Sequence, residues 1–411
     1  MKIAVLGAGI SGLGSAYLLS QKHEVDLYEK EGRLGGHART TIVNEEERSF
    51  GVDTGFLVFN HETYPLLTRL FEQLDVKIEN SEMSFGFWDE KSDSAYNGNS
   101  LGGMFVQKKN LFSLSHYKMI ADIIRFNKEA NKHVDSNSAA LDQSLGGYLR
   151  SYSDVFKERY LLPMGAAIWS TPSEKMHDFP ARTFLQFFKN HGLLGVTTQH
   201  QWLTVSGGSI NYVNAISKKI SGEVILNSPV ASLSRNEEGV LLHMDDGSVK
   251  QYDKVVMAMH APQALELLDD ATEHEKEILS RFAYKENQAV LHNDTKLLYP
   301  DRKSYAAWNY KTGGKENAVT LSYWINVLQN LVTDKEYFVS LNETAQIDDV
   351  IEAISYEHPQ FDAEAIQAQS RHDEIDGVMH THFAGAYWRY GFHEDGLWSA
   401  ERIAKKMGCA L

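Results

Sequence analysis

The sequence predicts an α/β fold into which a second, mixed α+β region is inserted. Three observations support this prediction. A strand, a glycine-rich turn and a helix open the chain, strand-like alternation of apolar residues returns after residue 223, and another strand–turn–helix pattern closes the chain. The 411 residues also exceed what one hydrophobic core usually holds, so we expect two domains.

The first element is a strand over residues 2–6 that runs into a G-x-G-x-x-G turn and a helix over residues 12–21. Gly7 permits a tight turn, Gly9 lets backbone N–H groups approach a pyrophosphate, and Gly12 allows the helix to pack closely on the strand. The pattern predicts a dinucleotide at the start of this helix, where the helix dipole favours phosphate.

A second strand is expected over residues 24–29, and its last residue, Glu29, stands where a carboxylate can accept both ribose hydroxyls. Arg33 and the double glycine at 35–36 follow, and they supply a cation and a flexible backbone beside the pyrophosphate. Residues 53–56 then offer small side chains against which a flat ring system can lie. Arg33, the double glycine and residues 53–56 together favour FAD over NAD as the dinucleotide.

The middle of the chain changes its periodicity twice. Helical spacing dominates residues 64–200, with apolar residues at i, i+3, i+4 and i+7 over residues 117–126. Alternation typical of strands returns over residues 223–233 and 239–244, and Asp246-Gly247 marks a hairpin turn after the second of them.

The last third of the chain is expected to return to the nucleotide-binding sheet. A buried strand is predicted over residues 255–259, further strands between residues 289 and 341, and a helix over residues 348–356. A final helix starts near Glu394 with two acids and ends in basic residues, as the helix dipole prefers. The predicted FAD-binding domain comprises residues 1–60, 203–290 and 372–411, and the substrate-binding domain residues 61–202 and 291–371.

Composition excludes several classes of protein. The formal net charge of −15, with no Lys/Arg cluster to offset it locally, argues against a nucleic-acid partner. The one cysteine, Cys409, excludes a disulfide within the chain, and its position near the C-terminus predicts a frayed thiol. The sequence contains no uninterrupted run of about twenty apolar residues, so no transmembrane segment is predicted. We expect a cytoplasmic protein. A peripheral encounter with a membrane is compatible with the sequence, but no amphipathic helix with a basic face is expected.

The segment from Gly385 to Gly396 contains a second glycine-bearing turn that opens a helix. A cofactor held from both chain ends favours FAD over NAD. The N-terminus of this helix would point at the pyrimidine edge of the flavin ring and stabilise the negative charge of the reduced state. Cys409 lies too far along the final helix to bond to flavin, so FAD is expected to be non-covalent.

These motifs resemble the flavin-dependent amine oxidase superfamily, which includes protoporphyrinogen oxidase and the phytoene desaturases. The chain is also similar to the FAD-binding region fused to the N-terminus of plant cyclopropane fatty acid synthases, and to its stand-alone bacterial relatives. The segments that carry this second resemblance are residues 28–38, 107–110, 168–173, 192–194, 201–205, 321–326 and 391–397.

The resemblance implies a Rossmann-type FAD-binding domain, amine-oxidase-like, with an inserted mixed α+β substrate domain. It further implies an FAD-dependent oxidoreductase that acts on a lipid acyl chain as a desaturase or saturase, by hydride transfer to or from flavin N5. A cyclopropane-synthase-like methyltransferase is the implied partner. An amine oxidase that acts on a small amine, and a flavin-bound accessory module of a lipid methyltransferase, remain open alternatives.

Carried over by position, the resemblance implies that the backbone of Val230 meets adenine and that Asp395 lies beside the flavin ring. The chain departs from the family at His37, where many members have arginine, and at Ala386, where they often have glutamate. The expected cofactor-binding residues are Gly7, Gly9, Ser11, Gly12, Glu29, Lys30, Arg33, Gly35, Gly36, His37, Gly55, Phe56, Val230, Gly385, Ala386, Phe392, Asp395, Gly396 and Leu397.

The catalytic residues are not evident from the sequence, because no general-base constellation stands out. The pair His380 and His382 lies in an expected strand with no carboxylate at ligand spacing, so no metal site is predicted. The weak catalytic candidates are His191, Trp169, Trp202, Tyr323 and His393.

Overall fold

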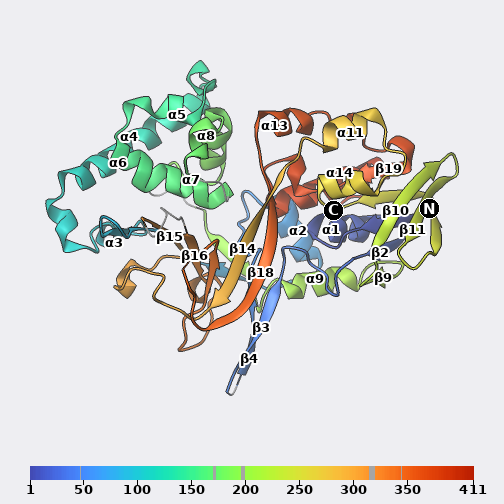
Figure 1. Cartoon of the computed structure of the whole chain (residues 1–411), viewed down its shortest axis with the longest axis horizontal. Coiled ribbons are helices and arrows are strands. Elements are labelled where there is room, and N and C mark those ends of the chain that lie inside the picture. Colours follow the sequence, from blue (N-terminus) through green and yellow to red (C-terminus); the bar gives the residue numbers. More distant parts are fainter. Residues whose placement is uncertain (47, 170–172, 196–199, 314–319, 344) are drawn as a thin grey trace.

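The computed structural model describes residues 1–46, 48–169, 173–195, 200–313, 320–343 and 345–411. The chain forms two lobes (Figure 1). One lobe contains both chain termini, and the other contains the helices from α3 (Leu101–Met104) to α8 (Ala181–Asn190). Two long paired strands, β14 (Tyr284–His292) and β18 (Val350–Pro359), lie between the lobes. The expected segment 168–173 is described only in part, since residues 170–172 lie outside the described ranges.

A five-stranded parallel sheet forms the centre of the first lobe and confirms the predicted α/β class. Its order is β19-β13-β1-β2-β9. Residues separated by more than two hundred positions therefore pair directly, as Ala4 does with Val255. The strands are β1 (Lys2–Leu6), β2 (Glu24–Tyr28), β9 (Val224–Ile225), β13 (Lys254–Met257) and β19 (Thr381–Phe383).

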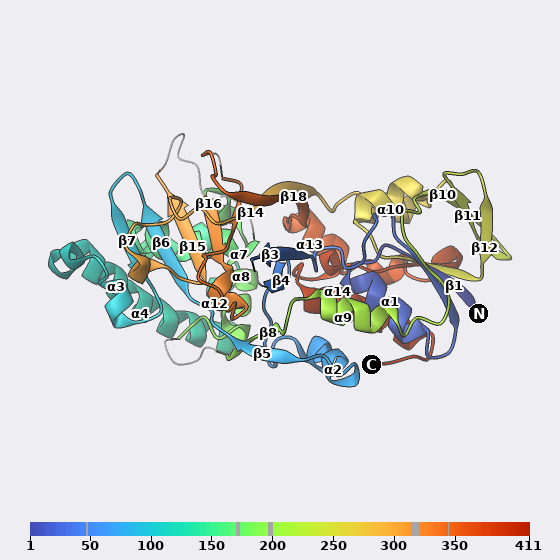
Figure 2. The same ribbon diagram turned by 90° about the horizontal axis from the view of Figure 1, so that it is seen from below.

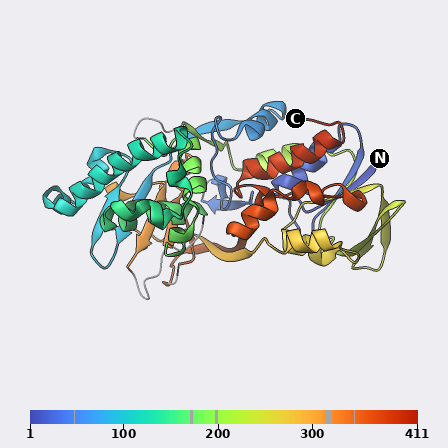
Figure 3. The same cartoon turned by 90° about the horizontal axis from the view of Figure 1, so that it is seen from above.

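Two helices from opposite ends of the chain lie side by side against this sheet, α1 (Ile10–Leu19) and α14 (His393–Lys406) (Figure 3). A Cβ at Gly14 would lie 2.7 Å from Leu397 Cδ1, so glycine allows the two helices to approach closely. The other helices of this lobe are α2 (Pro65–Gln73), α9 (Ile210–Ser217), α10 (Ala261–Leu267), α11 (Glu273–Leu279) and α13 (Ala363–Gln369).

An antiparallel sheet of β10 (Val230–Asn236), β11 (Gly239–Met244) and β12 (Val249–Tyr252) packs on the same lobe (Figure 2). The predicted turn at Asp246-Gly247 joins β11 to β12. Cys409 differs from its expectation: it is 2 % exposed and belongs to the core of this lobe, so it is not a frayed thiol.

The second lobe is built on a seven-stranded sheet of order β18-β14-β17-β16-β15-β6-β7. Helices from α4 to α8 lie over one face of it (Figures 1 and 3). The predicted domain boundary at residue 290 falls within β14. The remaining strands of the sheet are β6 (Phe85–Asp89), β7 (Ser94–Asn97), β15 (Trp308–Thr312), β16 (Thr320–Trp324) and β17 (Phe338–Leu341).

The remaining elements are two short strand pairs and the other helices of this lobe. Two strand pairs join the lobes: β3 (Thr40–Glu45) with β4 (Arg48–Asp53), and β5 (Ile78–Ser81) with β8 (Trp202–Val205). The helices are α4 (Leu114–Asp135), α5 (Leu145–Tyr148), α6 (Asp154–Phe156), α7 (Leu162–Trp169) and α12 (Ile325–Leu328).

Two sequence expectations about secondary structure were wrong. Residues 348–356 do not form a helix, because Val350–Pro359 is the edge strand β18, whose β-branched and aromatic side chains pair along the whole length of β14. Residues 64–200 are not uniformly helical, since β5, β6 and β7 also lie in this segment. The strands β5 and β6 pair with β8 and β15, which are far along the chain, and β7 pairs with the neighbouring β6. The helix over 117–126 is confirmed as part of α4.

Candidate functional site

The turn between β1 and α1 is shaped to receive an anion. Gly7 has φ 96°, in the left-handed region that favours glycine. Gly9 caps α1, whose first turn has neither a side-chain cap nor an acid. A Cβ at Gly9 would meet no atom within 4 Å, whereas a Cβ at Gly12 would lie 1.8 Å from the Gly7 carbonyl oxygen. Uncapped N–H groups beside open space fit a pyrophosphate.

The next predicted residues lie directly against this turn. Glu29 Oε2 accepts a hydrogen bond from the Ala8 N–H at 2.8 Å. A Cβ at Gly36 would lie 2.9 Å from Gly9 Cα, so the double glycine packs on the phosphate turn. Arg33 Nη1 donates to the Gly36 carbonyl oxygen at 2.9 Å, which holds the guanidinium beside the same backbone.

The predicted adenine side lies at the end of β2. The Ser228 N–H donates to the Glu29 carbonyl oxygen at 3.0 Å, and this contact brings the start of β10, at Val230, close to Glu29, the acid predicted to bind the ribose. Lys30 is exposed next to it. The arrangement leaves Lys30 free to approach the outer part of a bound nucleotide.

The C-terminal turn meets the N-terminal turn. A Cβ at Gly396 would lie 2.8 Å from Ser11 Oγ, so the start of α14 touches the start of α1. Asp395 accepts from the Phe392 N–H at 3.0 Å, and burial raises the pKa of this carboxyl to about 6. The Gly385 N–H donates to Ser399 Oγ at 2.9 Å, which fixes the turn that continues through the half-buried Ala386.

His37 carries an unsatisfied buried nitrogen beside these turns. Its Nε2 has no hydrogen-bond partner among the residues that the structure describes. The ring stacks on Tyr356 at 4.9 Å, and burial lowers the pKa of His37 to about 3, so it is neutral. Gly55 and Phe56 pack behind it, with the Phe56 N–H donating to the His37 carbonyl oxygen at 3.0 Å. A neutral imidazole with a free nitrogen fits a polar group of a cofactor.

A cluster of rings, which we call the aromatic wall, joins the second lobe to the segment before α14. Phe187 is at its centre: its ring lies 4.7 Å from Trp169, 3.9 Å from His191 and 5.2 Å from Phe392. Trp202 extends it, 6.4 Å from His191. The aromatic wall consists of Trp169, Phe187, His191, Trp202 and Phe392.

The two remaining catalytic candidates lie apart from this wall. His393 stacks on Phe56 at 3.9 Å and shares a 2.7 Å hydrogen bond with the Tyr212 hydroxyl. Burial lowers the pKa of His393 to about 3. Tyr323 is on β16, and its ring contacts Trp308 at 5.0 Å. Phe56 is thus the link between His393 and the predicted flavin region, and Tyr323 belongs to the seven-stranded sheet.

Sequence reasoning missed the roles of two buried acids near these turns. Glu394 accepts from the Leu66 and Leu67 N–H groups at the start of α2, at 2.9 and 3.0 Å, and burial raises its pKa to about 7. Asp53 accepts from the Ser209 N–H at 2.9 Å, and burial raises its pKa to about 6. For Glu394, the available signal was the pair of consecutive acids at the start of the last helix.

Comparison with known proteins settles the family. The model of the protein family described as "Flavin containing amine oxidoreductase" matches residues 10–407. The chain belongs to this family. The glycine turn, the uncapped helix and the free His37 nitrogen fit the flavin cofactor that the family implies, and the chain is a flavin oxidoreductase of the amine oxidase superfamily.

Individual relatives of this flavin oxidoreductase differ in what their names describe. A 4,4'-diapolycopen-4-al dehydrogenase from Metabacillus indicus is 48% identical over 56 residues, which are 13% of this chain and 11% of that protein. The CLA-producing fatty acid isomerase from P. acnes has a TM-score of 0.70 at 14% identity, covering 98% of both chains. Cyclohexylamine oxidase from Brevibacterium oxydans has a TM-score of 0.67 at 16% identity, covering 99% of both chains. The two structures show a shared fold.

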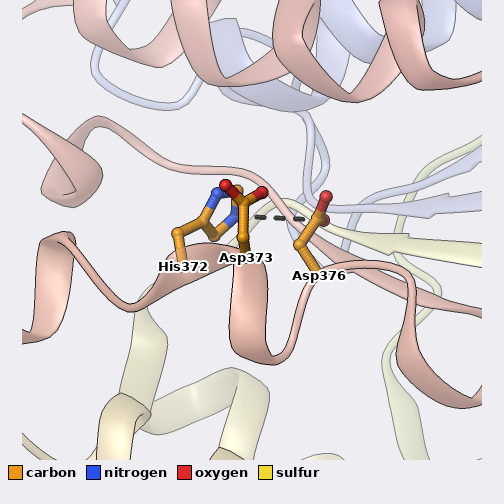
Figure 4. A group of neighbouring side chains, drawn as sticks. All are labelled: His372, Asp373 and Asp376. Atoms are coloured by element: carbon orange, nitrogen blue, oxygen red, sulfur yellow. Dashed lines mark ion pairs between the residues drawn. The ribbon is translucent and has the colours of Figure 1, made fainter.

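One cluster of the flavoenzyme, behind α14, has metal-ligand chemistry. Ligand atoms of His372, Asp373 and Asp376 lie within 4.8 Å of one another (Figure 4). Lys406 Nζ already lies 2.9 Å from Asp373 and 2.5 Å from Asp376, so an ammonium occupies the place of a cation. Asp376 also lies 3.0 Å from His382 Nδ1, which corrects the expectation that no carboxylate accompanies His382. The sequence spacing hid this contact because a tight loop reverses the chain between them.

Proposed function

We propose that this flavin oxidoreductase acts on the acyl chain of a lipid, removing hydrogen as a desaturase or adding it as a saturase. Bound flavin supplies two-electron hydride transfer at N5. The observation that carries the proposal is the aromatic wall, in which Phe392 from the C-terminal turn packs against Phe187 from the second lobe. An alkyl chain needs apolar surfaces that orient it and exclude water, and these rings offer them.

The charges around the wall favour an apolar substrate over a protonated amine. Burial lowers the pKa of His191 to about 4, so this imidazole is neutral at pH 7. The carboxylates of Asp53, Glu394 and Asp395 accept hydrogen bonds from backbone N–H groups and so serve to hold loops together. A carboxylate whose oxygens are free would bind a cationic substrate more strongly than carboxylates that already accept hydrogen bonds from the backbone.

The aromatic pair that could imitate an amine-binding sandwich is turned into the core. Tyr387 and Trp388 are both 2 % exposed, and their rings lie 4.8 and 5.1 Å from Phe282. The Trp388 indole N–H donates to the Phe383 carbonyl oxygen at 3.0 Å. These contacts support a structural role for the pair and weaken the amine alternative.

His191 is the side chain that we propose for the proton that leaves with the hydride. Its Nδ1 lies 3.0 Å from the Phe187 carbonyl oxygen, which can only accept, so Nδ1 carries the hydrogen and Nε2 is the acceptor. In desaturation, Nε2 of His191 would accept the proton from the carbon next to the one that gives up the hydride, so that a double bond forms between the two carbons. Burial makes the charged form of His191 unfavourable, which weakens this side chain as a base but favours release of the proton once it has been accepted.

The names of two relatives support this choice. One names a fatty acid as substrate and the other a polyene aldehyde, both apolar chains. The resemblance to the FAD-binding region of plant cyclopropane fatty acid synthases points to the same chemistry, and we propose a methyltransferase of that kind as a partner that supplies methylated or cyclopropanated chains. An accessory role, in which the flavoprotein presents lipid to that methyltransferase, is the competing proposal.

Anaerobic mixing of the purified yellow protein with candidate substrates tests the proposal. We expect methylated or unsaturated phospholipids to change the flavin absorbance, and small amines to leave it unchanged. His191→Gln keeps a hydrogen-bonding side chain but loses the titratable nitrogen, and it should slow bleaching at unchanged flavin content. Bleaching by amines would overturn the proposal, and bleaching by neither class, with lipid or synthase co-purifying, would favour the accessory role.

A further inference from the structure

The two most exposed large apolar side chains among the residues that the structure describes lie at the start of α4. Phe112 and Leu114 are 90 % and 87 % exposed. Leu111 and Tyr117 beside them are 47 % and 46 % exposed, and Ile124, two turns further along the helix, is 62 % exposed. We call these five residues the α4 apolar face. Exposed apolar side chains gathered in this way mark a surface that binds something.

Helical geometry places cations on the same side as these apolar residues. Lys118, Lys128 and Lys132 are exposed at the spacings that continue the outer side of α4. Met119 and Phe126 point into the lobe, where each is 1 % exposed. The outer side of α4 therefore combines apolar residues with long basic side chains, which is typical of a helix that lies in a membrane interface.

The local charge opposes the charge of the whole chain. Residues 108–132 contain six Lys or Arg and two acids, whereas the formal net charge of the protein is −15. Asp122 is buried and accepts from the Ser153 N–H at 3.0 Å, and Glu129 accepts from the Tyr152 hydroxyl. Two sequence expectations were therefore wrong for this segment: that no Lys/Arg cluster offsets the net charge, and that no amphipathic helix has a basic face.

Two exposed acids on neighbouring segments are paired with lysines. Asp93 lies 2.8 Å from Lys109 Nζ, and Asp154 lies 2.7 Å from Lys157 Nζ. These ion pairs mute the negative potential at the border of the face. Lys108, Lys118 and Lys128 are exposed and have no ion pair within 4.0 Å among the described residues.

The face is also well placed to meet a flat surface. Figures 1, 2 and 3 all show α3 and α4 at the end of the molecule remote from both chain termini. No helix among the described residues has the length and apolar character needed to cross a bilayer. Binding to a membrane by this face would therefore be interfacial.

We propose that the α4 apolar face docks the protein on the surface of a membrane that contains anionic phospholipids. Phe112 and Leu114 enter the boundary between head groups and acyl chains, and Lys108, Lys118 and Lys128 lie among the phosphates. The positive charge of these lysines complements the negative charge of the bilayer surface. The inference goes beyond the proposed chemistry, since it concerns only where the protein binds.

Vesicle flotation of the flavin-loaded protein tests the inference. We expect it to float with vesicles of phosphatidylcholine and phosphatidylglycerol, to float about tenfold less with phosphatidylcholine alone, and to be released as salt rises, because screening weakens the attraction between lysines and anionic lipid. Equal binding to both vesicles, or no binding to either, would overturn the inference.

Matched variants locate the binding surface. The double variant Phe112→Asp, Leu114→Asp should bind at least about tenfold more weakly, since it removes two apolar anchors and adds charge. Val249→Asp is the control: Val249 is 56 % exposed on β12 in the other lobe, and its variant should bind as the native protein does. Equal loss in both variants, or no loss in the double variant, would contradict the inference.

Two further measurements distinguish membrane docking from self-association and from the proposed chemistry. Light scattering of the double variant should report the same mass as the native protein, and a reduced mass without a change in vesicle binding would assign the face to self-association and overturn membrane docking. Bleaching by soluble fatty acids tests the proposed chemistry without vesicles. Vesicle binding without bleaching would support membrane docking and contradict the proposed substrate. Bleaching without vesicle binding would support the proposed substrate and contradict membrane docking.

Discussion

The predicted cofactor side and the proposed substrate side of this flavoenzyme are held together by opposite means. In the turn between β1 and α1, glycines bring backbone against backbone, and an added Cβ at Gly12 would lie 1.8 Å from the Gly7 carbonyl oxygen. Around Phe187, large rings meet at centroid distances of 3.9 to 5.2 Å, with side-chain contacts between separate elements. Backbone contacts tolerate almost no change, whereas side-chain packing can adapt. The backbone of the predicted cofactor side is therefore rigid, and we expect specificity to vary on the proposed substrate side.

The largest expected effect follows a side chain at Gly12. Gly12→Val should lower the free energy of unfolding by about 3 kcal/mol or more, because the Gly7 carbonyl cannot move away without opening the β1–α1 turn. Urea denaturation and the flavin content after purification measure both consequences. Gly9→Ala is the control, since its Cβ meets no atom within 4 Å: it should keep the stability but weaken FAD binding. A stable, yellow Gly12→Val protein would contradict the rigid side of the comparison.

A pH effect of intermediate size is expected at His393, where the two sides meet. Burial lowers its pKa from the usual 6.5 to about 3, so the unfolded chain binds a proton that the folded protein does not. The stability that this residue contributes is present above pH 6.5 and falls as pH decreases, by about 2 kcal/mol at pH 5.

His393→Asn can keep a hydrogen bond to Tyr212 but does not titrate, so its unfolding free energy should fall less between pH 7 and 5. Urea denaturation at each pH measures the difference. Glu394 and Asp395 have raised pKa values, which act in the opposite direction, and they cancel when the variant is compared with the native protein. The same substitution at the exposed His61 is the control. If the unfolding free energy falls equally between pH 7 and 5 for the native protein and for His393→Asn, this expectation is refuted.

A smaller effect is expected at Glu29, which tests whether the cofactor side binds through polar contacts as well as shape. Glu29→Gln should weaken FAD binding about tenfold, because the amide replaces one acceptor oxygen with a donor. Titration of the flavin-free protein with FAD, followed by flavin fluorescence, gives the affinity. The neighbouring exposed Glu31→Gln serves as control, and equal affinities of the two variants would remove Glu29 from the ribose site.

The smallest effect is expected on the adaptable side. Phe187→Leu should lower the free energy of unfolding by about 1 kcal/mol, because a hydrophobic side chain of similar volume lets the surrounding rings repack. Flavin content should be unchanged, and the rate of bleaching by acyl substrates should fall. Phe184→Leu, which lies one helical turn away and also contacts Trp169, provides the control. Loss of flavin from Phe187→Leu would show that the two sides are not separable.

Sequence patterns predicted best where the structure depends on neighbours along the chain. The turn at Gly7 and the acid at Glu29 follow from spacing within the N-terminal motif. The start of α14, expected near Glu394 and found at His393, follows from the charges and glycines around it. The strand β18 was predicted as a helix because its conformation depends on pairing with β14, about seventy residues earlier. The contact between Asp376 and His382 was missed for a similar reason, since loop geometry creates it.

Residue order alone established the α/β class, the glycine turn for a dinucleotide and the candidate cofactor residues, because each depends on local backbone conformation and on spacing of a few residues. Only the tertiary structure decided which aromatic residues form one wall, which acids serve backbone N–H groups, and that α4 turns its apolar and basic residues outward. Burial decides these properties, and burial depends on which distant segments pack together.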